Sequence, residues 1–113
     1  MRRSFQAQAI ALALAIAAWF QSPATAAETV QDLLKYCSAK DGSVQAIYCV
    51  GRITGIADAL FVFAQGSFCP KTSTTGGAEV QLFKNYATTH PEVWTQSDYN
   101  GVLYALNQKW PCI

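Results

Sequence analysis

The stretch YCVGRITGIADALFVFAQG, residues 48–66, decides the fold, because its apolar residues are too dense for a helix with one exposed side. Gly51 and Gly55 lie four residues apart in it, the spacing that lets two helices approach closely. A glycine inside a helix costs about 1 kcal/mol relative to alanine, so the pair needs a packing reason. We therefore expect a central helix from 43 to about 65, with Gly51, Gly55 and Asp58 on a side that packs against a neighbouring helix.

The same glycine spacing is found in membrane helices, so a membrane span is the first alternative. Arg52 and Asp58 lie in the middle of the run, and a charge at the bilayer centre costs about 2.5–3.5 kcal/mol even on the most lenient scale. The two charges favour the core helix of a soluble domain. Arg52 is expected to face solvent, with its aliphatic stem lying on apolar neighbours.

The N-terminus has the pattern of an export signal. Arg2 and Arg3 precede an apolar segment, residues 9–20, and small residues follow up to Ala26. That segment is shorter than the roughly 20 residues that a bilayer crossing needs. The pattern predicts a signal peptide over 1–26, cleaved near Ala26, and a single helical domain over 27–113.

All four cysteines, Cys37, Cys49, Cys69 and Cys112, follow the signal. An even number of cysteines in a short exported chain predicts disulfides, here two. Zinc is disfavoured because there is no CxxC pair and only one histidine, and we predict neither a metal nor a cofactor. A disulfide-bonded sulfur is no thiolate, so a nucleophilic role for Cys49 is also disfavoured.

Three further helices are predicted around the central one. The first follows the capping pattern that begins at Thr29, the third covers Gly77 to about Thr89, and the fourth opens at Thr95 with Asp98 in its first turn. The fold class is all-α, a small disulfide-stapled bundle of about four antiparallel helices. No strand pattern competes with it.

Alternating helix directions select one disulfide pairing out of three. Cys37 and Cys49 flank the first helix connection at one end of the bundle, whereas Cys69 and Cys112 follow the second and fourth helices at the other end. The predicted pairs are Cys37–Cys49 and Cys69–Cys112. The chain-entropy model gives the two closed loops about 3 and 4 kcal/mol of stabilisation.

Charge and motifs narrow the function. Without Arg2 and Arg3, six basic residues face seven acidic ones, so nothing electrostatic favours nucleic acid or an anionic membrane. No catalytic motif and no nucleophile–base pair occurs, so an enzyme is not predicted. His90 is expected to cap a helix end through its terminal carbonyls. Trp94, in a turn, is the better candidate for an exposed contact, and Trp110 for the core.

The order C…YCVGRITGIADA…FCP…HPE…AL…WPC resembles the Rap/Tai-type immunity proteins of bacterial type VI secretion systems. The resemblance implies an exported, periplasmic helical protein that binds and blocks a peptidoglycan-cleaving amidase effector, often as a homodimer. The matching positions are Cys37, Cys49, Gly51, Gly55, Asp58, Cys69, Pro70, His90, Pro91, Glu92, Ala105, Leu106, Trp110, Pro111 and Cys112.

Inhibition by binding needs a rigid surface and no chemistry of the inhibitor's own. We expect a helix connection to enter the enzyme's groove, and the turn that carries His90, Glu92 and Trp94 is the candidate partner-binding surface. A periplasmic helical chaperone or stress protein that binds unfolded clients is the alternative function. The low charge content counts against it, because holding clients in solution favours a charged surface.

Overall fold

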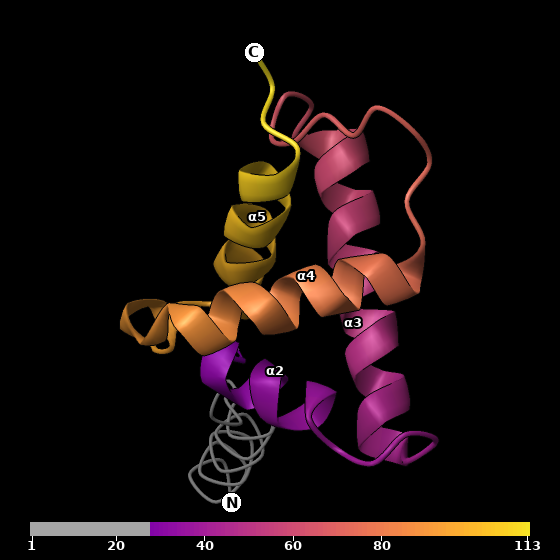
Figure 1. The fold of residues 1–113 in the computed structure, drawn as a ribbon, viewed down its shortest axis with the longest axis vertical. Coiled ribbons are helices and arrows are strands. Elements are labelled where there is room, and N and C mark those ends of the chain that lie inside the picture. The colour runs from indigo at the N-terminus through magenta and orange to yellow at the C-terminus, as the bar shows by residue number, and fades with distance from the viewer. Residues whose placement is uncertain (1–27) are drawn as a thin grey trace, which may run out of the picture.

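The structure is a computed structural model that describes residues 28–113 of the chain. The predicted signal peptide and its cleavage near Ala26 lie outside the described residues. Four α-helices and one 3-10 helix follow one another (Figure 1): α2 Val30–Cys37, α3 Val44–Phe63, α4 Gly76–Thr89, η1 Pro91–Val93 and α5 Asp98–Lys109. The all-α fold class is confirmed.

Each α-helix begins after a hydroxyl residue whose side chain accepts a hydrogen bond from the first turn: Thr29, Ser43, Thr75 and Ser97. Thr29 forms the predicted capping box with Asp32, each side chain accepting from the other residue's backbone N–H. The fourth helix begins at Asp98 and not at Thr95. Ser97 caps it, and residues before it form η1 and a turn.

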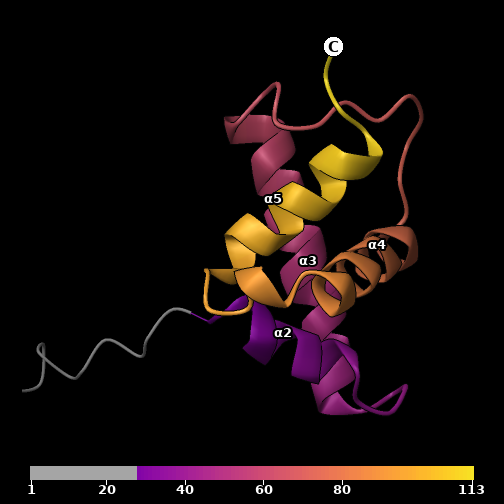
Figure 2. The same ribbon diagram turned by 60° about the vertical axis from the view of Figure 1, so that its left-hand side comes forward.

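Figure 1 shows α3 and α5 running in the same direction, with α4 lying across both and α2 beside the lower half of α3. Figure 2 shows the same crossing from the side. The bundle therefore differs from a simple antiparallel stack, because α4 crosses its neighbours at a steep angle. The relation that the disulfide prediction needs is kept: the ends of α3 and α5 meet at one end of the molecule.

The two disulfides are Cys37–Cys49 and Cys69–Cys112, as predicted, each with 5.0 Å between the two Cα atoms. The first joins the end of α2 to the first half of α3. The second joins the segments that follow α3 and α5. Between them they fix both ends of α3 to its neighbours.

The core lies where the four helices meet. Its completely buried side chains come from every α-helix: Val30, Leu33, Ile53, Leu60, Phe83, Ala87, Val102 and Leu106. Trp110 is half-buried and packs against this cluster, with its ring centroid 6.4 Å from that of Phe68. Burying an aliphatic or aromatic side chain contributes about 1.5–3 kcal/mol, so a core of this size can hold short helices together.

The prediction that Gly51, Gly55 and Asp58 pack against a neighbouring helix is wrong for the helices of this chain. All three are exposed, and a Cβ atom added at either glycine would meet nothing within 4 Å. The tightest approach is at Gly101 in α5, where an added Cβ would lie 2.5 Å from Val30 Cγ2 and 3.2 Å from Phe83 Cε2; at Gly76, the first residue of α4, it would lie 2.8 Å from Thr54 Cγ2 of α3. A buried glycine in the least apolar helix carries the packing.

Candidate functional site

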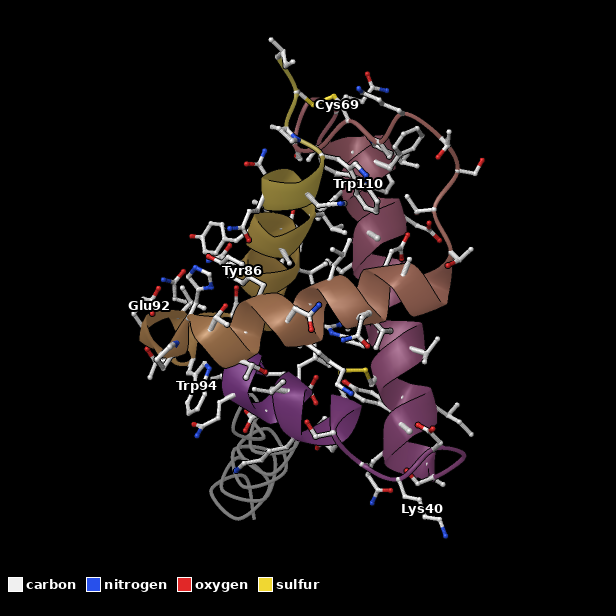
Figure 3. The ribbon with its side chains drawn as sticks, in the orientation of Figure 1. Lys40, Cys69, Tyr86, Glu92, Trp94 and Trp110 are labelled. Carbon is white, nitrogen blue, oxygen red and sulfur yellow. A yellow bond between two sulfur atoms is a disulfide. The ribbon has the colours of Figure 1, made fainter. Side chains whose placement is uncertain are left out.

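The corner between α4 and α5, residues 90–98, holds the three predicted partner-binding residues. Figure 3 shows Glu92 and Trp94 at one end of α4, with Tyr86 on the helix above them. The 3-10 turn η1 forms because Pro91 ends α4 and its fixed φ suits a new helical turn. Val93 is buried beneath the turn, which holds the corner against the core.

His90 caps α4, as predicted. Its Nδ1 lies 2.8 Å from the carbonyl oxygen of Tyr86, and since a carbonyl can only accept, Nδ1 carries the proton. The imidazole also stacks on the Tyr86 ring, with the centroids 4.0 Å apart. These contacts fix both the ring and its tautomer, so Nε2 is the nitrogen left to meet a partner.

Trp94 is half-buried rather than fully exposed. Its indole N–H donates to the carbonyl oxygen of Ala87, 2.7 Å away, near the end of α4. Its own carbonyl oxygen accepts from the backbone N–H of Gln31 at 3.1 Å. The residue therefore braces the corner from inside and presents only part of its ring.

Glu92 is the exposed charge of the corner. Burial raises the pKa of the Tyr86 phenol, and the nearby carboxylate of Glu92 raises it further. The phenol therefore stays neutral at physiological pH. The corner thus presents one carboxylate beside a neutral, stacked aromatic pair.

An ion pair between an exposed arginine and a buried aspartate, at the last residue of the corner, was missed by sequence reasoning. Asp98 is 1% exposed, and Arg52 of α3 donates to it twice, from Nε at 2.7 Å and from Nη2 at 3.1 Å. Hydrogen bonding to Asp98 raises the pKa of Arg52. Arg52 is exposed, as expected, with 42% of its side chain accessible. Its pairing with Asp98 was not predicted, because 46 positions separate the two residues that the fold brings together.

Glu28 extends this network at the first described residue. The Tyr48 hydroxyl donates to Glu28 Oε2 at 2.7 Å, and that hydrogen bond raises the pKa of Tyr48. The Glu28 carbonyl accepts from the Asp98 backbone N–H at 2.9 Å. The beginning of the described chain is thereby fastened to the start of α5.

The outer side of α3 is a second candidate surface. Large apolar side chains are exposed along it, with Val44 80% and Phe63 88% exposed at its two ends. Between the ends, Gly51 and Gly55 form a shallow groove of about 320 Å³ with Arg52 and Tyr99 beside it. Exposed apolar surface in this quantity on one helix is typical of an interaction surface.

Helix α3 is also the one helix among residues 28–113 that is long and apolar enough to cross a membrane. In the structure Ile53 and Leu60 are completely buried against the other helices, and Cys49 joins it to α2. One side of the helix therefore belongs to the core. The apolar side chains on the other side of α3 remain exposed.

Side chains that could act as nucleophiles or metal ligands are few in the part of the chain that the structure describes. All four cysteines are in disulfides, and no group of three or more His, Cys, Asp or Glu side chains is placed to hold a metal ion there. The described surface therefore offers two features for binding a partner: the corner with its exposed Glu92 carboxylate, and the apolar outer side of α3.

Comparison with known proteins gives one match. The model of the Rap1a immunity proteins matches residues 29–112, which covers every helix and all four cysteines described above. No match was found among curated proteins or among solved structures. The chain is thus a member of the Rap1a immunity protein family.

Proposed function

We propose that this immunity protein is exported to the periplasm, that its partner is a peptidoglycan-cleaving amidase effector of a type VI secretion system, and that it protects by binding without catalysis of its own. The family match over residues 29–112 is the observation that carries the proposal. Two disulfides support it further, because a rigid body loses little conformational entropy on binding.

Inhibition of the enzyme is the direct test. The mature chain, residues 27–113 with both disulfides formed, is mixed with each exported amidase of the producing bacterium, and release of peptides from purified peptidoglycan is measured. We expect one amidase to be inhibited at equimolar concentration. Undiminished hydrolysis by all of them would contradict the proposal.

Within that complex we propose the corner of His90, Glu92 and Trp94 as the contact. Glu92→Ala removes an exposed carboxylate without touching the core, and we expect it to weaken amidase binding about tenfold. Asp41→Ala is the matched control, an exposed carboxylate in the turn between α2 and α3. Equal affinities for both variants would place the contact elsewhere.

A homodimer through the outer side of α3 is proposed as the assembled form. The exposed apolar residues need a cover, and the side-chain-free surface of Gly51 and Gly55 would let the same helix of a second copy approach closely. Gly55→Leu fills the groove, and the Cβ atom that it adds meets nothing of its own chain within 4 Å. Sedimentation should show a weaker dimer for this variant, and a monomeric parent protein would exclude the assembly.

A chaperone function is the second candidate, and the same exposed side of α3 favours it. Such a surface could hold apolar segments of unfolded clients. The discriminating measurement is the aggregation of a heat-unfolded reporter enzyme at increasing concentrations of the mature chain. Suppression of aggregation together with no inhibition of any amidase would select the chaperone.

A further inference from the structure

A cavity of about 550 Å³ lies far from the corner, between the second half of α3, the first turn of α4 and the long connection that joins them. Ala57, Phe61, Phe68 and Pro70 supply its apolar walls. Its polar lining comes from one helix position on each side and from the connection: Asp58, Lys71, Thr72, Ser73, Thr74 and Glu79. The connection itself arches over this region in Figure 1.

Glu79 is the unusual member of this lining. It is only 7% exposed, and in the described part of the chain its carboxylate makes one side-chain hydrogen bond, accepting from the Thr74 hydroxyl at 2.6 Å. Over residues 28–113 the ion pairs within 4.0 Å are those that Arg52 makes, so Glu79 has no cationic partner there. Buried carboxylates are rarely left without one.

Asp98 is a second buried carboxylate, and it is paired within the chain, so it serves as a comparison for Glu79. Asp98 receives two hydrogen bonds from one guanidinium. Glu79 receives only a hydroxyl and the positive end of α4, where a helix dipole supplies about half a unit charge. Asp98 thus has a cationic partner within 4.0 Å and Glu79 has none among residues 28–113. The cavity lies beside the Glu79 carboxylate.

The rest of the cavity indicates which cation fits. Phe61 is 62% exposed and stands 6.5 Å, centroid to centroid, from the ring of Phe68, so an aromatic wall borders the space next to the carboxylate. A planar guanidinium stacks on such a wall and pairs with carboxylates, whereas an ammonium ion is compact and strongly hydrated. A metal ion is disfavoured, since the described residues bring no three ligating side chains together.

We infer that this cavity binds an arginine side chain of a partner protein, with Glu79 as its buried counter-ion, Asp58 as a second carboxylate at the rim and Phe61 as the stacking surface. The inference needs a partner with an exposed arginine and does not depend on that partner being an amidase. Its failure and the failure of the proposed function are therefore separate results.

The test titrates the ¹⁵N-labelled mature chain with N-acetyl-arginine amide and follows its amide resonances. We expect saturable shifts of Phe61, Thr74 and Glu79. N-acetyl-citrulline amide, which has the same shape without the charge, should give none at matched ionic strength. Shifts that do not saturate, or equal shifts with citrulline, would overturn the inference.

Two carboxylate variants and one control assign the contact. Glu79→Gln should weaken arginine binding about tenfold, the loss typical of a charge-assisted hydrogen bond. Asp58→Asn, at an exposed position, should weaken it about threefold. Glu92→Gln, at the distant corner, should leave it unchanged. Unchanged affinity in Asp58→Asn and Glu79→Gln would overturn the assignment, and if Glu79→Gln does not fold, the result for Asp58→Asn decides it.

Lys71 also lines the cavity and is the competing counter-ion. If the cation comes from a partner, Lys71→Met should leave the melting temperature unchanged and tighten arginine binding, because a competing charge is gone. A lower melting temperature with unchanged arginine affinity would show that Lys71 itself neutralises Glu79, and the inference would then be wrong.

Discussion

The glycines of α5 and α3 meet opposite surroundings. Around the first half of α5 the packing is closed, because Val30 of α2 and Phe83 of α4 leave Gly101 no room for a side chain, and Arg52 of α3 reaches the buried Asp98. On the outer side of α3, Gly51 and Gly55 face open space in the single chain. The same residue type therefore marks a closed seam in one place and an open surface in the other, and the difference lies in the neighbouring helices and not in the local pattern.

The largest effect is expected from breaking the ion pair at the closed seam. Arg52→Ala leaves the Asp98 carboxylate buried, with the Tyr99 backbone N–H, 2.8 Å away, as its one remaining hydrogen-bond donor among residues 28–113. We expect a loss of about 3 kcal/mol in the free energy of unfolding, because an uncompensated buried charge is costly. Urea denaturation of the mature chain measures it.

Asp98→Asn is the reciprocal change, and we expect it to cost less. The Arg52 side chain is 42% exposed and can be hydrated when its partner is neutral, whereas the Asp98 side chain is only 2% exposed. Equal losses for Arg52→Ala and Asp98→Asn would show that both charges are held away from water.

Adding one methyl group to the closed seam should also destabilise the fold. In Gly101→Ala the new Cβ would lie 2.5 Å from Val30 Cγ2, so α5 or α2 must shift. Overpacking of this kind costs about 1–3 kcal/mol. Thermal unfolding followed by circular dichroism should show a lower melting temperature. An unchanged melting temperature would mean that the side chains around Gly101 can move apart at no cost in stability.

The same substitution on the open side should have the opposite sign. In Gly55→Ala the added Cβ meets no atom of its own chain within 4 Å, and the position lies inside a helix, so the change should stabilise the monomer by about 0.5–1 kcal/mol. The measurement is the same unfolding curve as for Gly101→Ala, recorded at a protein concentration below that at which the proposed dimer forms. A destabilised monomer would contradict the open surroundings of Gly55.

The smallest effect concerns pH. Hydrogen bonds from the Thr29 backbone and hydroxyl lower the pKa of Asp32 below 3.8, so the contribution of this capping box is present above the unfolded-state pKa and is lost as the pH falls through the folded-state value. Asp32→Asn should therefore lose a little stability at neutral pH and show a weaker dependence on pH in the acid range. Parallel curves for the two proteins would contradict this role.

Local and topological features were predictable from the sequence. Thr29 and Ser43 indicate where their helices begin, because an N-cap acts within one helical turn. The disulfide pairing was predictable because it depends on which helix ends lie together. Glycine roles were not predictable in α3. A helix that is apolar on all sides gives no indication of which side is covered, so Gly51 and Gly55 could not be told from a packing pair.

Long-range pairings were the other unpredictable part. Asp98 has the sequence position of an ordinary acidic residue in a first turn, and nothing near it indicates Arg52. The same holds for Glu79, whose burial depends on the connection that folds over it. At the corner, the capping role of His90 was predictable because it is local, whereas the anchoring of Trp94 by Ala87 was not.

The Cys69–Cys112 disulfide has a consequence for the resistance of the protein to proteolysis. The exposed connection, residues 71–75, lies within the 43-residue interval that this bond spans. A protease that cut there once would leave both pieces covalently joined, with α4 and α5 still attached to α3 at one end. Such a nicked molecule would run as one band on a gel until it was reduced, and it would keep the corner intact.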